Sequence, residues 1–489
     1  MQRSIIFLGC IFSFIIARNS VDVTQWKGFN LLEKFGKSNK PFLEEDFQLI
    51  KELGFNFVRL PIDYRSYVNG DDWYNFNEAS LNEIDQAVEW GKKYGIHICI
   101  NLHRGPGFCI NPPAEKLNLW SDDDALQAFC DHWRMFAKRY KGIAPENLTF
   151  NLLNEPARAR PEQYIKVFSA AIEVIHAIDN KRLIIVDGMD VGKTPYTNFT
   201  GLDFVIQSTR GYQPGAISHY RASWVKGSDK MPVPVWPPVP SIPAYFYGPQ
   251  KVKDGLMGPL ELKGNFAAGT VIIYDVNIVS EKSLIIIKAD GLEFYRKDFI
   301  PKDGKGEWTE VVYMKQYHRF QNVYNKAFSA VLKAAASTLL IENIDGDWMT
   351  INSLKLEMPN GVRSEFVTDK TWGQKQITVT IKPDGSLDDI PGFIPEKILD
   401  DYIAPWLAIK AQGVNIFVGE WGSYNKTPHD VSLAWMRSWL RRYKENEIGW
   451  CLWNFRGPFG ILDSERTDVQ YEDWHGHKLD RKMLEMLRE

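Results

Sequence analysis

The hydrophobic positions of this chain fall into short apolar runs, which alternate with longer segments of helical spacing. The runs are rich in β-branched and aromatic residues, as strands are. They predict strands at residues 26–31, 55–61, 96–103, 148–155, 182–188, 204–210, 414–420 and 448–453. The segments between them predict helices at residues 43–53, 81–94, 121–140 (with Ser121 as its N-cap), 161–179, 395–411, 429–443 and 479–487. Strands that alternate with helices indicate a parallel sheet, and their number indicates closure into an α/β fold, the (β/α)8 TIM barrel.

The alternation is interrupted after the sixth predicted strand. Residues 231–249 are rich in proline and aromatic residues, which excludes a helix and predicts an extended linker or a loop wall. Residues 258–381 contain short β-prone runs separated by Gly, Asp and Lys, and only residues 321–336 have helical spacing. We therefore expect an antiparallel β-sandwich, jelly-roll-like, inserted between strand 6 and helix 6. The predicted bounds are 19–228 and 383–489 for the barrel, and 229–382 for the linker and insert.

The N-terminal residues predict export. Arg3 precedes an apolar run at residues 5–17, which is too short to span a bilayer and has the length of a signal-peptide core. We predict a signal peptide at residues 1–18 and a secreted or extracytoplasmic protein. A buried first strand is one alternative for this run. A lipid anchor at Cys10 is another, because the residues just before Cys10 faintly resemble a lipoprotein box.

Composition and charge limit the classes of function. A net charge of −3 and a pI of about 6.4 argue against a nucleic-acid partner and give no lead to a substrate. Aromatic residues make up 13% of the chain, which suits a sugar-binding cleft and a large core equally well. Cys99 and Cys451 fall within predicted strands, which favours free buried thiols over disulfides. No His or Cys spacing suggests a metal site, and we expect no cofactor.

Two of the predicted strands end in a glutamate. One is the strand that ends at Glu155, where Pro156 stops the sheet ladder, and the other ends at Glu420. Side chains alternate along a strand, so Asn151 and Glu155 should share the inward face. In a barrel the last inward residues stand at the mouth, where such enzymes place their chemistry. Two carboxyl groups at one rim are what glycoside hydrolysis requires.

The residues around these glutamates match a known pattern. Asn154-Glu155-Pro156 resembles the Asn-Glu-Pro signature of glycoside hydrolase family 5, the cellulase family. Further residues typical of that family stand in order at successive predicted strand ends, namely Arg59, His103, Glu420 and Trp453. The resemblance covers about residues 20–228 and 383–489. In one departure, Arg210 stands where the family usually carries a His, two residues before Tyr212.

The resemblance implies a retaining, two-step mechanism, which needs carboxyl groups about 5–5.5 Å apart. Glu420 would be the nucleophile, with Arg59 stabilising its negative charge and Tyr212 holding it through the hydroxyl. Glu155 would be the acid/base, with its pKa raised by partial burial and by the other carboxylate.

The resemblance also implies the sugar contacts. Asn154 would bond the sugar 2-hydroxyl, His103 would bond a hydroxyl in the same subsite, and Trp453 would provide a stacking floor. The role of Arg210 stays open, because it can bond either a carboxylate or a sugar hydroxyl. His219, further along the chain, is an alternative source of the missing imidazole.

We therefore expect a retaining β-glycosidase that acts on a β-glucan, most simply as an endo-β-1,4-glucanase. Alternatives are a β-mannanase, an exo-acting β-glucosidase or β-1,3-glucanase and, in another class, a catalytically silent glycan-binding protein. The insert is either a carbohydrate-binding module, with Trp308, Trp348 or Trp372 on a sheet face, or a wall of the cleft. We expect a monomer whose partner is a β-linked polysaccharide or oligosaccharide, with no nucleic acid, and no membrane beyond the possible lipid anchor.

Overall fold

The computed structural model describes residues 21–489, except 37–38, 200, 203, 239 and 389–393. The predicted signal peptide and Cys10 lie outside the described residues. The chain divides into two compact units, Met1–Trp236 with Glu396–Glu489, and Pro237–Pro395. Both ends of the second unit lie further along the chain than the expected bounds of 229–382. Within the described ranges, no helix is both long enough and apolar enough to cross a membrane.

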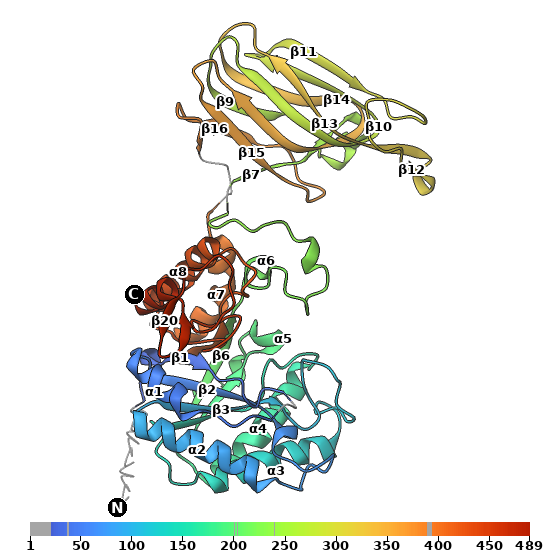
Figure 1. Cartoon of the computed structure of the whole chain (residues 1–489). Helices are drawn as coiled ribbons and strands as arrows, with labels where there is room; N and C mark the ends of the chain where they lie inside the picture. The colour runs from blue at the N-terminus through green and yellow to red at the C-terminus, as the bar shows by residue number, and fades with distance from the viewer. Residues whose placement is uncertain (1–20, 37–38, 200, 203, 239, 389–393) are drawn as a thin grey trace, which may run out of the picture. The chain divides into compact units, whose positions relative to one another are not determined.

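The first unit is built on a closed barrel of parallel strands (Figure 1). Its strands are β1 (Lys27–Asn30), β2 (Phe57–Asp63), β3 (His97–Arg104), β4 (Leu148–Asn151), β5 (Leu183–Asp187), β6 (Val205–Gly211), β18 (Asn415–Trp421) and β19 (Gly449–Leu452). Each strand pairs with the next one in this order, and β19 pairs with β1 to close the ring. The expected (β/α)8 barrel is confirmed.

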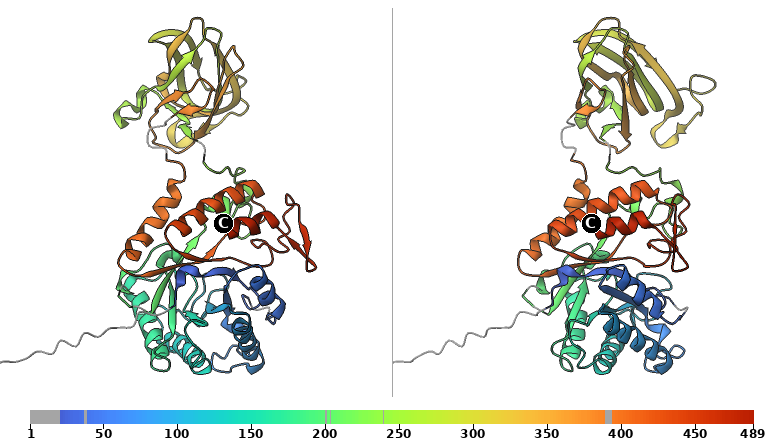
Figure 2. Two further views of the ribbon diagram at one scale, coloured as in Figure 1. Left: turned by 90° about the vertical axis from the view of Figure 1, so that its left-hand side faces the viewer. Right: turned by 60° about the vertical axis from the view of Figure 1, so that its left-hand side comes forward.

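The long helices lie around the outside of these strands (Figure 2). They are α1 (Glu44–Glu52), α2 (Glu78–Tyr94), α3 (Asp123–Arg139), α4 (Pro161–His176), α7 (Lys397–Lys410), α8 (His429–Glu445) and α9 (Arg481–Arg488). Two short helices, α5 (Met189–Gly192) and α6 (Gly215–Ser218), follow strands β5 and β6. The predicted N-cap of α3, Ser121, is wrong. Asp122 caps the helix, because its carboxylate accepts from the N–H groups of Asp124 and Ala125 and also suits the helix dipole.

The barrel interior changes character along the strands. Near the strand starts, Trp26, Phe57 and Phe417 pack into an apolar cluster, which also contains the free thiols of Cys99 and Cys451. Near the strand ends, the buried residues are polar, and they include Asn30, Asn101, Asn151 and Asp187. Polar side chains, which an apolar core would exclude, meet in this layer, and the layer contains the candidate site.

The second unit is built on a single β-sheet. It is inserted between β6 and α7, as expected for strand 6 and helix 6. Its strands are β7 (Ser241–Pro243), β8 (Tyr245–Tyr247), β9 (Leu260–Phe266), β10 (Val271–Ala289), β11 (Leu292–Phe299), β12 (Tyr313–Met314), β13 (Arg319–Val331), β14 (Ala336–Glu357), β15 (Arg363–Asp369), β16 (Thr378–Ile381) and β17 (Leu387–Asp388). The pairings are antiparallel, except β7 with β15 and β9 with β16, which are parallel. The long strands β10 and β14 contain several bulges and enclose a separate apolar core. A small hairpin of β20 (Glu472–Trp474) and β21 (His477–Leu479) belongs to the first unit.

Two local predictions in this region are wrong. Residues 321–336 are not helical, because most of them belong to β13, which pairs with β10. Their helical spacing is outweighed by cross-strand pairing, which often overrides local propensity. The proline-rich segment is not a loop wall throughout, since Tyr245–Tyr247 forms β8 and pairs with β14. Trp236, in the part of this segment that belongs to the first unit, donates its indole N–H to Ser438 Oγ of the same unit at 3.0 Å.

Candidate active site

Glu420 and Glu155 reach the same end of the barrel by different routes. Glu420 lies within β18 and is 3% exposed. Glu155 was expected as the last inward residue of its strand, but β4 already ends at Asn151. Glu155 instead has a left-handed backbone with φ of 47°, and its N–H donates to Asp187 Oδ2 at 2.9 Å. A loop contact, rather than strand alternation, therefore orients Glu155.

Arg59, at the middle of β2, is the first of two buried cations in the site. Its Nη1 donates to Glu420 Oε1 at 2.7 Å, and its Nη2 donates to Asn154 Oδ1 at 2.8 Å. The remaining contacts are to Asn151 Oδ1 (2.9 Å) and Asn30 Oδ1 (2.9 Å). Charge-assisted bonds of this kind stabilise the negative form of a carboxylate. Arg59 thus both stabilises the Glu420 charge and fixes the Asn154 amide.

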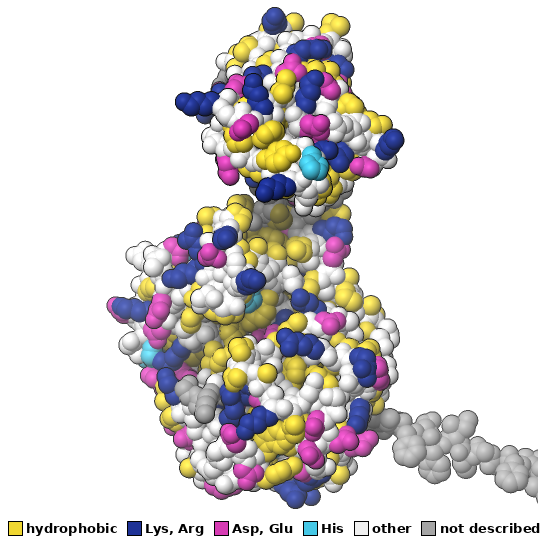
Figure 3. Space-filling model, turned by 90° about the vertical axis from the view of Figure 1, so that its right-hand side faces the viewer, with side chains coloured by type: hydrophobic (Ala, Val, Ile, Leu, Met, Phe, Trp, Pro, Cys, Tyr) yellow, Lys and Arg dark blue, Asp and Glu magenta, His cyan; other side chains and the backbone are white. Residues whose placement is uncertain are grey.

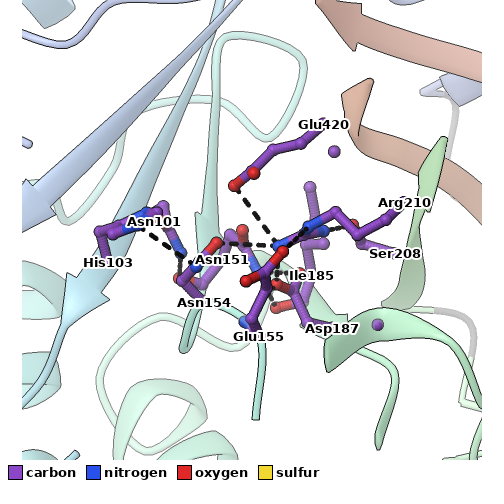
Figure 4. A network of polar contacts seen from close by, with 12 residues as sticks. Asn101, His103, Asn151, Asn154, Glu155, Ile185, Asp187, Ser208, Arg210 and Glu420 are labelled. Atoms are coloured by element: carbon purple, nitrogen blue, oxygen red, sulfur yellow. Dashed lines mark hydrogen bonds and ion pairs between the residues drawn. The ribbon is translucent and has the colours of Figure 1, made fainter. Parts of the chain in front are cut away.

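Arg210, near the end of β6, is the second buried cation. Its Nε donates to Glu155 Oε1 at 3.1 Å, and its Nη2 lies 3.5 Å from Glu420 Oε1 (Figure 4). Nη2 also donates to Asn154 Oδ1 at 2.8 Å and to Asp187 Oδ2. One guanidinium therefore contacts both glutamates that the sequence pointed to.

Asn154 and His103 form the floor between the two cations. The Oδ1 atom of Asn154 accepts from Arg59 and Arg210, so the amide orientation is fixed. Its Nδ2 faces Nε2 of His103 at 3.4 Å. Burial, together with the nearby arginine charges, lowers the pKa of His103 well below its ordinary value, so the ring is neutral. A second Asn154 N–H remains for a ligand.

Tyr212 and Trp453 complete the set of expected residues. The Tyr212 hydroxyl donates to Glu420 Oε2 at 3.3 Å. Trp453 follows β19, and its ring lies 5.6 Å from the ring of His103 and 5.4 Å from that of Phe35. His219 packs against Tyr212, with ring centroids 5.0 Å apart, and does not take the place of Arg210.

A cavity of about 620 Å³ opens over these groups. It is lined by Glu155, Glu420, His103, Tyr212 and Trp453, and also by aromatic and ionic side chains, namely Phe35, Trp224, Tyr424, Phe459, Asp63, Arg65 and Arg104. In the space-filling view it is a hollow bordered largely by hydrophobic side chains (Figure 3). Such a mixture of flat apolar rings and a few convergent polar groups is typical of a site for a small polar ligand with apolar faces.

The two glutamates differ in their electrostatic environment. Burial raises the pKa of Glu155 to about 7, and the negative charge of Glu420 adds to that rise, while the Arg210 cation opposes it. Burial alone would raise the pKa of Asp187. The charges of Arg210 and Arg59, with hydrogen bonds, hold it below its ordinary value instead. At neutral pH the site therefore contains one carboxyl that can give or take a proton, next to carboxylates paired with cations.

The part of the chain that carries most of these residues resembles a known family. Residues 17–220 match the model of the cellulase family, glycosyl hydrolase family 5. This part of the barrel is therefore similar to that family. The match contains Arg59, His103, Asn154, Glu155 and Arg210 and ends before the second unit.

Curated relatives and a solved structure agree with this similarity to family 5. Endoglucanase C of Acetivibrio thermocellus is 29% identical over 184 residues, which are 37% of this chain and 53% of that protein. Cellodextrinase A of Ruminococcus flavefaciens is 29% identical over 185 residues, which are 37% of this chain and 54% of that protein. The chain thus spans about half the length of the curated relatives it matches. A crystal structure described as a glycoside hydrolase gives a TM-score of 0.60 at 26% identity, covering 95% of this chain and 98% of that one.

The family 5 pattern alone misses two side chains that build the site. Asp187 is completely buried at the end of β5, and Asn151 joins it to Arg59 by donating to Asp187 Oδ1 at 3.0 Å. A polar residue at an inward position of a predicted barrel strand was the available signal for both. No cluster of His, Cys, Asp or Glu that could hold a metal occurs among the residues described.

Proposed function

We propose that this chain is a retaining β-glycosidase that hydrolyses the O-glycosidic bonds of a β-glucan. The observation that carries the proposal is the pair of glutamates in one cavity with unlike surroundings. Glu420 accepts a 2.7 Å bond from Arg59, whereas burial raises the pKa of Glu155 to about 7. This pairing suits a nucleophile that stays charged and an acid/base that exchanges protons near neutral pH.

The proposed reaction has two steps. Glu420 attacks the anomeric carbon while Glu155 donates its proton to the leaving oxygen, so a glycosyl-enzyme ester forms as the glycosidic bond breaks. Glu155, now a carboxylate, takes a proton from water, and that water replaces Glu420 at the same carbon. The free N–H of Asn154 and the ring of Trp453 are positioned to bind the sugar through a hydroxyl and through stacking.

The substrate we propose is a β-1,4-glucan or its short oligosaccharides. Two relatives of equal identity carry the names endoglucanase and cellodextrinase, which supports a glucan and leaves chain length open. The first measurement is product analysis on carboxymethyl-cellulose, mixed-linkage β-glucan, laminarin, glucomannan and short cello-oligosaccharides, with Glu420→Gln as the control. A ladder of oligosaccharides means endo-action, and a single small sugar means exo-action. Turnover only of laminarin or glucomannan replaces the β-1,4-glucan proposal by a β-1,3-glucanase or a β-mannanase.

The roles of the two glutamates are tested by azide rescue. In Glu420→Ala, azide takes the place of the nucleophile, so an activated β-glycoside should yield the α-glycosyl azide. In Glu155→Ala, azide attacks the glycosyl-enzyme, so the product should be the β-glycosyl azide. Exchanged products would reverse the assignment. The absence of any turnover in the unaltered chain, with glycan binding retained, would favour the silent binding protein.

We further propose that the second unit binds glycan through an aromatic cluster. Tyr245 and Tyr247 on β8 stack at 5.5 Å, and Trp372 packs edge-on to both at 5.1 and 5.2 Å. Trp348 on β14 joins the cluster, 5.8 Å from Trp372, which is 50% exposed. Trp308 lies apart from it, against Tyr324. The exposed ring of Trp372 offers a stacking surface for a sugar face, whose C–H groups are apolar.

The cluster is tested by pull-down on insoluble cellulose in the Glu420→Gln background, which prevents hydrolysis. Trp372→Ala should lower the bound fraction, while Trp308→Ala, an aromatic residue of the same unit outside the cluster, should leave it unchanged. Equal binding by both variants and the parent would assign the unit a structural role.

Export is also proposed, on the apolar run at residues 5–17. Mass spectrometry of the mature N-terminus distinguishes cleavage near residue 18 from lipidation at Cys10. Light scattering on the mature protein tests the proposed monomer.

A further inference from the structure

Arg210 has its whole hydrogen-bonding capacity directed at the protein. A guanidinium has five N–H donors in a fixed planar fork. The groups that accept them are Glu155 Oε1 (3.1 Å), Ser208 Oγ (3.2 Å), Thr209 O (3.2 Å), Asn154 Oδ1 (2.8 Å) and Asp187 Oδ2. The side chain is 3% exposed. With all five donors used, Arg210 keeps none for a sugar hydroxyl or a substrate carboxylate.

Asp187 is the other half of the pair. It is completely buried, and Oδ2 accepts from both Arg210 and the Glu155 N–H (2.9 Å), while Oδ1 accepts from Asn151 (3.0 Å). The Glu155 backbone has φ of 47°, a conformation that costs a non-glycine residue free energy unless its surroundings hold it. Asp187 therefore holds the main chain of Glu155, and Arg210 holds its carboxyl group (Figure 4).

We propose that Arg210 and Asp187 form a buried ion pair that positions Glu155 against Glu420 and sets the proton affinity of Glu155. In this assignment Arg210 is a positioning residue and not a ligand of the sugar. The inference deepens the proposed glycosidase function and rests on it for its catalytic meaning. Of the two roles left open for Arg210, a bond to a carboxylate or to a sugar hydroxyl, the contacts with the five protein acceptors favour the first.

The two members of the pair act on Glu155 with opposite sign. The Arg210 cation, 3.1 Å from Oε1, favours the charged carboxylate, while the Asp187 anion favours the protonated form. The charged and titratable groups that act on Glu155 come from four elements. They are Glu420 on β18, Arg210 on β6, Asp187 on β5, Tyr212 after β6 and Tyr402 on α7. Of these groups, Arg210 and Asp187 hydrogen-bond to Glu155, and they carry opposite charges. Substituting one or the other should therefore shift the pH at which Glu155 titrates in opposite directions.

The test measures the titration of Glu155 without any substrate. Protein labelled with 13C at the glutamate carboxyl carbon is titrated by NMR, and the Glu155 signal is identified by its loss in Glu155→Gln. Arg210→Gln should raise the titration midpoint, and Asp187→Asn should lower it, each by about one pH unit or more. Ser208→Ala removes an Arg210 partner without a change of charge and should leave the midpoint unchanged. Shifts in the same direction, or no shift in either variant, would overturn the proposal.

The substitution of Asp187 by Asn keeps shape and volume, so its downward shift is a test by itself if Arg210→Gln does not fold. Because no turnover is needed, an inactive parent would count against the proposed function and leave this test valid.

Kinetics then separate a positioning role from a ligand role. Arg210→Lys keeps the positive charge but loses the planar guanidinium. We therefore expect kcat to fall at least about tenfold, with KM near that of the parent. The fall of the rate as pH rises should remain as in the parent. If Arg210 bound the sugar, Arg210→Lys and Arg210→Gln would raise KM and leave the Glu155 midpoint in place, which would also overturn the proposal.

Discussion

Arg59 donates a hydrogen bond of 2.7 Å from Nη1 to Oε1 of Glu420, and the two side chains are 1% and 4% exposed. An ion pair at this depth has given up its hydration on both sides. Removing one partner leaves the other as a buried, uncompensated charge, which is more costly than the loss of the pair as a whole. Arg59 should therefore matter for folding as well as for the proposed chemistry.

Arg59→Gln should destabilise the folded chain by about 3–5 kcal/mol and lower kcat/KM by about 100-fold or more, because Glu420 loses its charge-assisted bond. Chemical denaturation and steady-state kinetics measure the two effects. Arg160→Gln is the matched control, since Arg160 pairs with Glu162 on the surface, where both side chains are about two-thirds exposed or more, at 71% and 67%. Equal stability of the two variants would contradict the buried-pair argument.

The rate of the proposed reaction should fall as pH rises through about 7. Burial, the Glu420 charge and the Asp187 charge raise the pKa of Glu155 to about 7, and the leaving oxygen needs its proton. The measurement is kcat/KM against pH on a substrate with a poor leaving group. On an activated substrate, whose leaving group departs without a proton, kcat/KM should fall less as pH rises. A fall of kcat/KM centred near pH 4.5, the ordinary pKa of glutamate, would rule out Glu155 as the acid.

The same group makes stability depend on pH. Its pKa is raised in the folded chain from 4.5 to about 7, so the folded state binds the proton more tightly than the unfolded state. Wild-type stability should therefore fall, relative to Glu155→Gln, as pH rises from about 4.5 to 7, by on the order of 3 kcal/mol, and the difference should then stay constant. Thermal unfolding of both proteins at pH 4, 5.5, 7 and 8 measures this. A gap between them that does not change with pH would count against the raised value.

Gly28 should not tolerate a side chain. A Cβ atom at this position of β1 would lie 1.7 Å from the carbonyl oxygen of Phe57 in β2, and neither strand can move without opening the barrel. Gly28→Ala should cost more than about 3 kcal/mol of stability or prevent soluble expression. Gly36→Ala is the control, because nothing lies within 4 Å of a Cβ there. A well-folded Gly28→Ala protein with the parent unfolding temperature would show that the strands are further apart.

The sequence was informative wherever a local pattern and the global fold agree. The barrel strands were predictable because buried parallel strands are short apolar runs between helices, and Glu155 and Glu420 were found because each stands where such a run ends. The reason given for Glu155 was nevertheless wrong, since β4 ends at Asn151. Only the fold brings Asp187 within 2.9 Å of the Glu155 N–H, and no spacing along the chain encodes that contact.

Other features depended on partners distant in sequence. Residues 321–336 have helical spacing, but most of them pair with β10 as a strand. Asn151 gave one available signal, a polar residue at an inward strand position, but its bond to Asp187 exists only because β4 and β5 are neighbours. Arg210 was recognised as a departure from the family pattern, whereas its role follows only from counting the acceptors around it.

The insertion between β6 and α7 affects the order in which the chain can fold. Barrel closure pairs Ile206 with Asn415, and the intervening chain must be looped out before that contact forms. Long loops cost entropy, and slow topologies are those dominated by distant contacts. In the second unit, Gln376 donates to the carbonyl oxygens of Pro243 and Tyr245 at 2.9 and 2.8 Å, so this unit ties its own two ends together once it has formed. Early assembly of the inserted unit would shorten the loop that the barrel has to close, and a mutation that slows the insert should also delay the last step of barrel formation.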